Sequence, residues 1–239
     1  VTLHDVLAGS ADVSEAIVEG PHGMAVIPGS TDLDAFARAD PEALAPALDA
    51  LAERYDHVVV DTGAGLSNDT VVPLTAVDEV LLVSTPTRDA LSDTEKSRQV
   101  ADRLGVAVAG AALTRADGAS ADSRIVTEIL DAEVLASIPD ADEVRAASEA
   151  GEPLTTFAPG SEAAAAFRSL ASALTGADLG GDGGEIRVPA EAVESVLVSG
   201  GSPVAHSSKR IPSAATATSP SKPARSMLST IASWFPSVW

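Results

Sequence analysis

The 239-residue chain is strongly acidic: it has 35 aspartate and glutamate residues against 15 lysine and arginine residues, a formal net charge of −20, and only 3% aromatic residues. This balance argues against a DNA-binding face on the body of the protein, because neutralising phosphates requires clustered lysine and arginine. The absence of cysteine excludes a disulfide framework, a thiolate metal site and an iron–sulfur cluster. The length allows one sizeable domain plus appendages, with a core of valine, leucine, isoleucine and alanine.

Lysine is nearly absent, occurring only as Lys96, Lys209 and Lys222, so arginine carries most of the positive charge. An acidic surface with few lysines stays hydrated in concentrated salt, which favours a halophilic cytoplasm; an acidic protein of an ordinary cytoplasm is the alternative. The sequence has no apolar run long enough to span a bilayer, and its first residues do not resemble a signal peptide. We therefore expect an intracellular protein.

The first fifty residues predict short helical turns and one strand before a regular helix. Two helical patterns fall within Val1–Val18, and Met24–Ile27 has the composition of a short buried strand. Ser30–Asp34 follows as a capped turn, in which the two aspartates favour capping over catalysis. Pro41–Arg54 predicts a helix, because proline opens it and leucines recur on one face.

The most informative stretch follows that helix and reads Val58-Val59-Val60-Asp61-Thr62-Gly63-Ala64-Gly65. Three β-branched residues in a row predict a strand buried on both faces, as in a parallel sheet. Ligands of open α/β sheets bind at the carboxyl ends of strands, and an aspartate there is the Walker B arrangement that holds Mg²⁺ beside a nucleotide phosphate. Gly63 and Gly65 would let backbone N–H groups approach an anion. A plain strand-to-helix turn capped by Asp61 or Thr62 is the alternative.

Strands and helices alternate through the rest of the body. Right-handed βαβ crossovers then give a parallel sheet between helices, so the predicted fold class is α/β with three layers. The predicted helices are 71–76, 92–104, 122–130, 142–150 and 161–174, and the predicted strands are 80–84, 106–113 and 134–138.

The character of the chain changes after Thr175. Residues 176–225 are rich in glycine, serine, proline and alanine, which bury too little apolar surface to offset the entropy of ordering, so we interpret them as a disordered linker. From Ser195 onward there is no acidic residue, and the basic residues are Lys209, Arg210, Lys222 and Arg225.

Residues 226–239 regain an apolar pattern that predicts an amphipathic helix with aromatic residues on one face. Such a helix, preceded by basic residues, is typical of a membrane-interface anchor, whereas docking onto this domain or into the groove of a partner protein is the alternative. Pro236 would end the helix near Phe235. The residues predicted to bind the membrane are Met227, Leu228, Ile231, Trp234 and Phe235.

Several of these segments together resemble the MinD/ParA family of deviant Walker-A P-loop ATPases, and in particular the MinD-like proteins of halophilic archaea. The resemblance covers residues 1–175, which would form the ATPase domain, and its motifs occur in the family's order. The matching motifs are Val58–Gly65, Leu113-Thr114-Arg115, Ile138-Pro139-Asp140, Gly151–Leu154 and Ala158–Ser161.

This resemblance implies ATP and Mg²⁺ as cofactors, slow hydrolysis, a homodimer in the ATP state, and positioning of cell-division or other machinery at the membrane through a regulator or cargo protein. Asp61 would be the catalytic residue that orders Mg²⁺ through water, and Gly65 would sense the γ-phosphate. Thr114 and Arg115 would flank the adenine on one side, with Pro139 and Asp140 on the other. Gly63 stands where the bacterial members more usually have proline.

The 239 residues contain no Gly-x-x-x-x-Gly-Lys-Ser/Thr motif, which the family places on its first strand and loop, before the point that matches Val1. The lysine for the β- and γ-phosphates and the hydroxyl for Mg²⁺ are then missing, as is about one βαβ unit of 30 residues or more. We therefore expect the chain to be a fragment, or a reading frame with a wrong start, that does not bind ATP productively by itself and leaves an unpaired sheet edge.

Three functions remain open at this stage. A membrane-associated positioning ATPase, cytoplasmic and peripheral on the inner face of the cell membrane, is the leading hypothesis. A nucleotide-free, membrane-tethered binding module is the second. A ParA-type partitioning ATPase is the third, disfavoured because an acidic body does not suit nucleic acid. A Rossmann dehydrogenase would need a Gly-x-Gly-x-x-Gly motif after a strand, which the sequence does not have.

Overall fold

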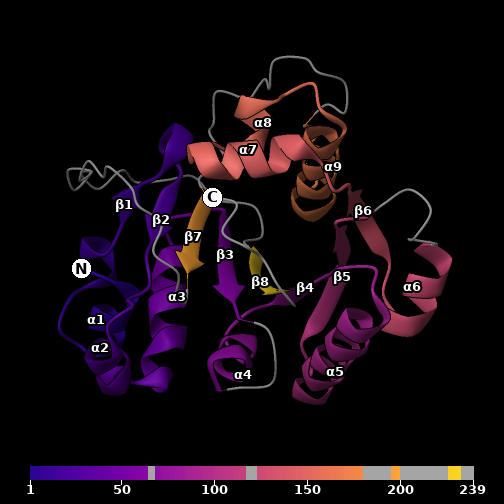
Figure 1. The fold of residues 1–239 in the computed structure, drawn as a ribbon. Helices are drawn as coiled ribbons and strands as arrows, with labels where there is room; N and C mark the ends of the chain where they lie inside the picture. The colour runs from indigo at the N-terminus through magenta and orange to yellow at the C-terminus, as the bar shows by residue number, and fades with distance from the viewer. Residues whose placement is uncertain (64–67, 117–122, 180–194, 200–225, 233–239) are drawn as a thin grey trace.

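The computed structural model describes residues 1–63, 68–116, 123–179, 195–199 and 226–232 (Figure 1). The strands are β1 Val18–Glu19, β2 Ala25–Ile27, β3 His57–Thr62, β4 Glu79–Ser84, β5 Ala107–Thr114, β6 Val134–Ile138, β7 Ser195–Ser199 and β8 Ser226–Ala232. The α-helices are α1 Leu3–Leu7, α2 Leu33–Arg38, α3 Leu44–Ala52, α4 Asn68–Leu74, α5 Arg88–Leu104, α6 Ser123–Leu130, α7 Asp142–Ala150, α8 Leu154–Phe157 and α9 Glu162–Thr175. Short 3₁₀ turns lie at Val13–Glu15, Pro21–Gly23 and Pro41–Ala43.

Within the described residues the strands form one sheet in the order β1-β2-β7-β3-β8-β4-β5-β6. The β1–β2 pair is antiparallel, and the other neighbouring pairs are parallel. The carboxyl ends of β2 to β8 therefore meet along one edge of the sheet. We call this the carboxyl edge; it is where an α/β sheet binds its ligands.

Helices cover both faces of the sheet, as the alternation of buried residues along β4 shows. Val80 and Leu82 pack into the core cluster with Leu91 of α5, whereas Leu81 and Val83 pack with Leu170 of α9. Figure 1 shows α3, α4, α5 and α6 on one side of the strands and α7, α8 and α9 on the other. The predicted three-layer α/β architecture is confirmed.

Helix boundaries follow the capping residues that the sequence supplies. The side-chain oxygens of Asp32, Thr87 and Ser161 each accept a hydrogen bond from a backbone N–H in the first turn of the helix that follows. The helices α5 and α9 end at Gly105 and Gly176, whose left-handed φ angles of 75° and 70° suit glycine best. The interpretation of the Ser30–Asp34 aspartates as caps is confirmed for Asp32.

Strand β3 is buried differently from the prediction. Val58, Val60 and Thr62 are buried, whereas the alternate residues, Asp61 among them, are only half-buried. Val58 and Val60 pack in the same cluster as the leucines of α3, so one face of β3 is fully covered and the opposite face is not. The prediction that this strand is buried on both faces was therefore wrong, and the half-covered face carries the Asp61 side chain.

The structure also corrects two predictions for the C-terminal part of the chain. Residues 195–199, which were predicted to belong to a disordered linker, form β7 between β2 and β3. Residues 226–232, predicted as the start of an amphipathic helix, form β8 between β3 and β4. Short isolated helices are only marginally stable in water, while the flanking strands offer a complete set of backbone hydrogen bonds on both sides. The rest of 180–225, and 233–239, lie outside the described residues.

Of the described helices, none has the length and apolar character needed to cross a bilayer.

Candidate functional site at the carboxyl edge of the sheet

Asp61 lies at the penultimate position of β3, at the carboxyl edge. Its ladder partners are Ser199 of β7 on one side and Thr230 of β8 on the other. Burial raises the pKa of the Asp61 carboxyl, because removing water disfavours its charged form. A nearby cation would stabilise the charged form of a carboxylate in such a partly buried place. The role predicted for Asp61 is to order one such cation, Mg²⁺.

The turn after β3 begins at Gly63, which is exposed and has open space around the position of a Cβ. Among the described residues no contact there requires glycine, so these neighbours would leave space for the proline of the bacterial motif. Gly65, predicted to sense a γ-phosphate, lies outside the described residues. Of the two predicted site residues in Val58–Gly65, Asp61 is therefore the one whose surroundings the structure describes.

The ends of β5 and β6 bring the second group of predicted residues together. Thr114 is the register partner of Ile138, and the backbone N–H of Ala116 donates a 3.0 Å hydrogen bond to the carbonyl oxygen of Ile138. Arg115, between them, has a left-handed φ of 53°. Pro139 directly follows Ile138, so Thr114–Arg115 and Pro139–Asp140 lie side by side at the ends of β5 and β6.

Asp140 is exposed and lies 3.7 Å from Arg145 of α7, measured between Oδ1 and Nη1. Arg145 also forms an ion pair with Asp142 at the start of the same helix. The Asp140 carboxylate is thus oriented from α7 while it remains open to solvent. It could accept a hydrogen bond from a ligand lying over the ends of β5 and β6.

Asp61 and Thr114 do not meet. Strands β8 and β4 lie between their strands, which corresponds to a lateral separation of about 14 Å at three inter-strand spacings. A ligand that contacts both must therefore extend along the edge. In the described part of the chain, no group of three or more metal-binding side chains comes together. Mg²⁺ in proteins is usually held by one or two carboxylates together with waters and substrate phosphates, and Asp61 is a carboxylate of that kind at the carboxyl edge.

Two hydrogen bonds at this edge were not predicted from the sequence. The Thr94 hydroxyl of α5 lies 3.0 Å from the Ser84 hydroxyl at the end of β4, and both side chains are buried. At the end of β2, the backbone N–H of Ser30 donates a 2.9 Å hydrogen bond to Nδ1 of the buried His4. Both contacts hold the backbone where a strand ends. No local sequence signal marks either one, because the partners come from separate elements.

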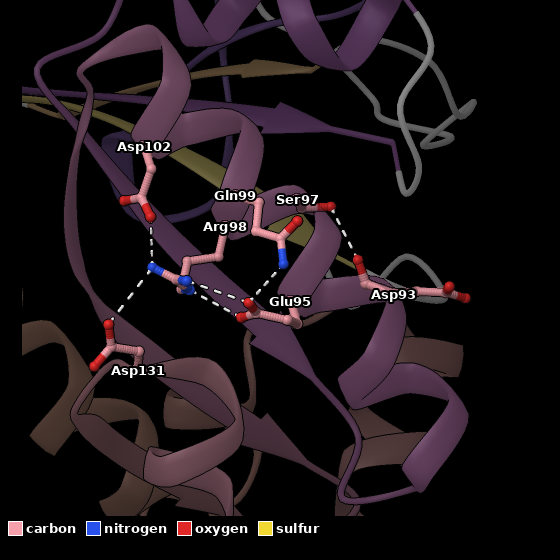
Figure 2. Close-up of polar contacts among 7 residues, drawn as sticks. All are labelled: Asp93, Glu95, Ser97, Arg98, Gln99, Asp102 and Asp131. Atoms are coloured by element: carbon pink, nitrogen blue, oxygen red, sulfur yellow. Dashed lines mark hydrogen bonds and ion pairs between the residues drawn. The ribbon is translucent and has the colours of Figure 1, made fainter.

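The most extensive polar network among the described residues lies elsewhere. Figure 2 shows Arg98 of α5 bonded to Glu95 and Asp102 of the same helix, and 3.8 Å from Asp131 after α6. The hydrogen bond with Glu95 raises the pKa of Arg98 further above its usual range. Asp131 precedes β6, so this network stands near the amino edge of the sheet. Its role is to tie α5 to α6, remote from the candidate site.

No protein-family model matches the chain. An uncharacterized ATP-binding protein of Methanocaldococcus jannaschii is 36% identical over 179 residues, covering 74% of this chain and 68% of the relative. The cell division ATPase MinD of Pyrococcus furiosus superposes with a TM-score of 0.68 at 32% identity, covering 73% of this chain and 75% of that one. The chain belongs to the MinD/ParA family of ATPases. The septum site-determining protein MinD of Pyrococcus horikoshii, complexed with Mg-ADP, gives 0.68 at 30% identity, with 73% of each chain covered.

Family membership confirms the resemblance on which the sequence-based site was built. It does not place the residues predicted to bind the membrane on a helix. Met227, Leu228 and Ile231 lie in β8, paired with β3 and β4. Trp234 and Phe235 lie outside the described residues.

Proposed function

We propose that this chain is a MinD-type ATPase that works on the inner face of the cell membrane and positions cell-division or other cellular machinery. The observation that carries the proposal is the position of Asp61, half-buried at the carboxyl edge of a MinD-type sheet. Two of the compared proteins support nucleotide as the ligand: the Methanocaldococcus relative is an ATP-binding protein, and the Pyrococcus horikoshii MinD is complexed with Mg-ADP.

In this proposal the nucleotide lies along the carboxyl edge. Asp61 orders Mg²⁺ through water beside the phosphates, and Gly65 senses the γ-phosphate. The adenine lies about 14 Å away across the sheet, between Thr114–Arg115 and Pro139–Asp140. A raised pKa favours this use of Asp61, because a divalent cation offsets the cost of holding a carboxylate away from water.

Membership of the MinD/ParA family is also the basis for the partners that we expect. We expect a homodimer in the ATP state, a protein regulator or cargo, and contact with the membrane through the segment that begins at Ser226. Charge supports the membrane contact: residues 195–239 contain four basic and no acidic residues in a chain of net charge −20. Such a segment is attracted to anionic lipid headgroups, although concentrated salt would weaken that attraction.

One observation favours a second candidate. The 239 residues contain no phosphate-binding Gly-x-x-x-x-Gly-Lys-Ser/Thr motif, so a nucleotide-free, membrane-tethered binding module is the alternative. A ParA-type partitioning role is disfavoured by the acidic body.

Titration of a fluorescent ATP analogue, with and without Mg²⁺, separates the candidates. The ATPase proposal expects saturable, Mg²⁺-dependent binding, and it expects Asp61→Asn to weaken the Mg²⁺-dependent part by about tenfold. Glu79→Gln is the matched control, since Glu79 is a carboxylate at the first position of β4, at the opposite edge of the same sheet. Binding that is absent or indifferent to Mg²⁺ would favour the nucleotide-free module.

A further inference from the structure

A surface hollow of about 210 Å³ lies between the start of α3 and the end of α4, on the side of the sheet where Figure 1 shows α3, α4, α5 and α6. Leu44 and Ala45 line it from α3, and Val72 and Ala76 line it from α4 and the turn that follows. Ala45 is exposed, so the hollow opens to solvent. Its lining is apolar on both sides, with Glu42 as its one carboxylate.

The floor of this hollow belongs to the core that supports the Asp61 strand. Leu44 is buried in the same apolar cluster as Val60 of β3, and Val72 and Ala76 pack against that cluster. Helix α3 precedes β3 in the chain, and α4 follows it. A side chain bound in the hollow would therefore contact the helices that lie before and after the Asp61 motif.

The size of the hollow suits one bulky apolar side chain better than a whole small molecule. A cavity of about 150 Å³ accepts benzene, which is close in size to the side chain of leucine or phenylalanine, whereas pockets for drug-sized ligands span about 300–1,000 Å³. The hollow lies between these values and nearer to the first. Pockets that accept one anchor residue of a partner protein dominate the binding energy of many interfaces.

The surroundings of the hollow are acidic. Glu42 lines it, and the neighbouring Asp40 accepts a 3.0 Å hydrogen bond from the Glu42 backbone N–H; both residues are exposed. Residues 31–49 contain five acidic residues and one basic residue, Arg38. Carboxylates around an apolar hollow attract a basic segment, and they repel the acidic surface of a second copy of this chain.

We propose that the hollow between α3 and α4 binds a basic segment of a partner protein. The segment inserts one side chain of the size of leucine or phenylalanine and places lysine or arginine beside Glu42 and Asp40. This inference goes beyond the proposed function, because it stands whether or not the chain binds ATP. It names the surface and the chemistry of a protein partner that the proposed function leaves unspecified.

A display library of short peptides, selected on the full chain, tests the chemistry that the hollow accepts. The expected binders carry several lysine or arginine residues and one bulky apolar residue. Ala45→Trp fills the hollow from an exposed position, and Glu42→Lys reverses the charge beside it. Each substitution should weaken binding of the selected peptides by at least about tenfold.

Two substitutions elsewhere on the surface are the matched controls. Ser169→Trp adds the same side chain on α9, and Glu128→Lys makes the same charge change on α6; both positions are exposed. Neither residue lines the hollow, so both variants should bind the selected peptides as the unmodified chain does. Peptides that bind Ala45→Trp as tightly as they bind the unmodified chain would overturn the inference, as would selection of neutral or acidic peptides.

Salt separates docking from general attraction to an acidic protein. In about 1 M salt the Debye length falls to about 3 Å, so the effect of Glu42→Lys should shrink while the effect of Ala45→Trp persists. Binding that disappears altogether in that salt would show attraction to the net charge of −20 and no apolar anchor, which would contradict the proposal.

Hydrogen–deuterium exchange on the unmodified chain guards against variants that fold poorly. A selected peptide should slow exchange in residues 41–45 and 72–76, the two segments that line the hollow, and should leave α9 unchanged. Protection of other segments without these two would place the peptide elsewhere and overturn the assignment.

Two further results would name a different occupant and so replace the proposed one. Residues 195–239 contain four basic and no acidic residues, so a synthetic peptide of 222–239 is included. If it occupies the hollow more tightly than every selected peptide, the occupant is the chain itself. Self-association that Ala45→Trp abolishes in analytical ultracentrifugation would assign the hollow to a second copy. Nucleotide binding at the carboxyl edge is tested separately by Mg²⁺ and Asp61→Asn, so failure of one proposal leaves the other standing.

Discussion

Asp61 of β3 and Thr230 of β8 are partners in a parallel ladder, although they lie well over a hundred positions apart in the chain. The carboxylate that the sequence singled out is thus flanked on both sides by strands from the C-terminal part of the protein, since Ser199 of β7 is its other partner. The surroundings of Asp61 depend on the strands 195–199 and 226–232 as well as on the motif that contains it.

Asp61→Asn should raise thermal stability at neutral pH. Because burial raises the pKa of Asp61 in the folded chain, the folded state binds its proton more tightly than the unfolded state does. The stability contributed by this carboxyl is therefore complete below about pH 4 and is lost as pH rises through the raised folded value. Since solvent screens a half-buried carboxylate, we expect Tm to rise by about 1–3 °C at pH 7.

The pH dependence of the stability gain tests whether burial of the charged carboxyl is its cause. Calorimetry at pH 7 and at pH 4 should show the advantage of Asp61→Asn shrinking at the lower pH, where the native carboxyl becomes protonated. An advantage that is constant with pH, or a loss of stability at pH 7, would contradict the assigned cause.

Gly110→Ala should destabilise the sheet by about 1–3 kcal/mol. Gly110 has a φ of 151°, and a Cβ there would lie 2.6 Å from Cγ of Leu135 and 2.9 Å from the carbonyl oxygen of Glu133. Backbone atoms cannot move aside as a flexible side chain can. Gly63→Ala is the control, because it has open space; urea unfolding should shift strongly for the first variant and little for the second.

Arg98→Ala should lower the free energy of unfolding by about 1–2 kcal/mol, because it removes charge-assisted hydrogen bonds to Glu95 and Asp102 from a side chain that is only 14% exposed. Lys96→Ala removes an exposed pair with Asp93 on the same helix and should cost no more than about 0.5 kcal/mol. Urea unfolding at low and high salt measures both. Equal effects of the two substitutions would show that the network adds nothing beyond a surface ion pair.

Thr94→Val should cost about 1 kcal/mol, since it removes the hydroxyl that bonds the buried Ser84 oxygen while it keeps the shape of the side chain. Thr94→Ser retains the hydroxyl and should recover most of this hydrogen-bond energy. Because Ser84 ends β4 at the carboxyl edge, Thr94→Val should also weaken Mg²⁺-dependent nucleotide binding. An unchanged unfolding midpoint for Thr94→Val would show that this buried hydrogen bond contributes little.

The parts of the fold that depend on local patterns could be predicted from the sequence. Val58–Val60 predicted β3 because β-branched residues fit a pleated strand, and the periodicity of 92–104 predicted α5, although that helix begins one turn earlier, at Arg88 after its Thr87 cap. The short helix α2 was missed, since its large apolar residues Leu33 and Phe36 are exposed and only the small Ala35 is buried. Asp61 and the Thr114–Arg115 pair followed from their places after apolar strands.

What could not be predicted depends on partners distant in the sequence. The segment 226–232 has apolar residues whose spacing suits a helix, yet β3 and β4 supply ladders on both sides, and these decide its conformation. Residues 195–199 alternate as a strand does, but the surrounding glycines and serines suggested a linker. The contacts Ser84–Thr94 and His4–Ser30 likewise join separate elements, so no spacing rule marks them.

The place of β7 and β8 on either side of β3 also has a consequence for how the protein is made. During synthesis β3 leaves the ribosome long before the strands that flank it, by a delay on the order of ten seconds at ordinary elongation rates. Through that interval both edges of β3 are open to pairing with other chains, and closing loops of this length is slow. The nascent protein should therefore need a chaperone more than the finished one does.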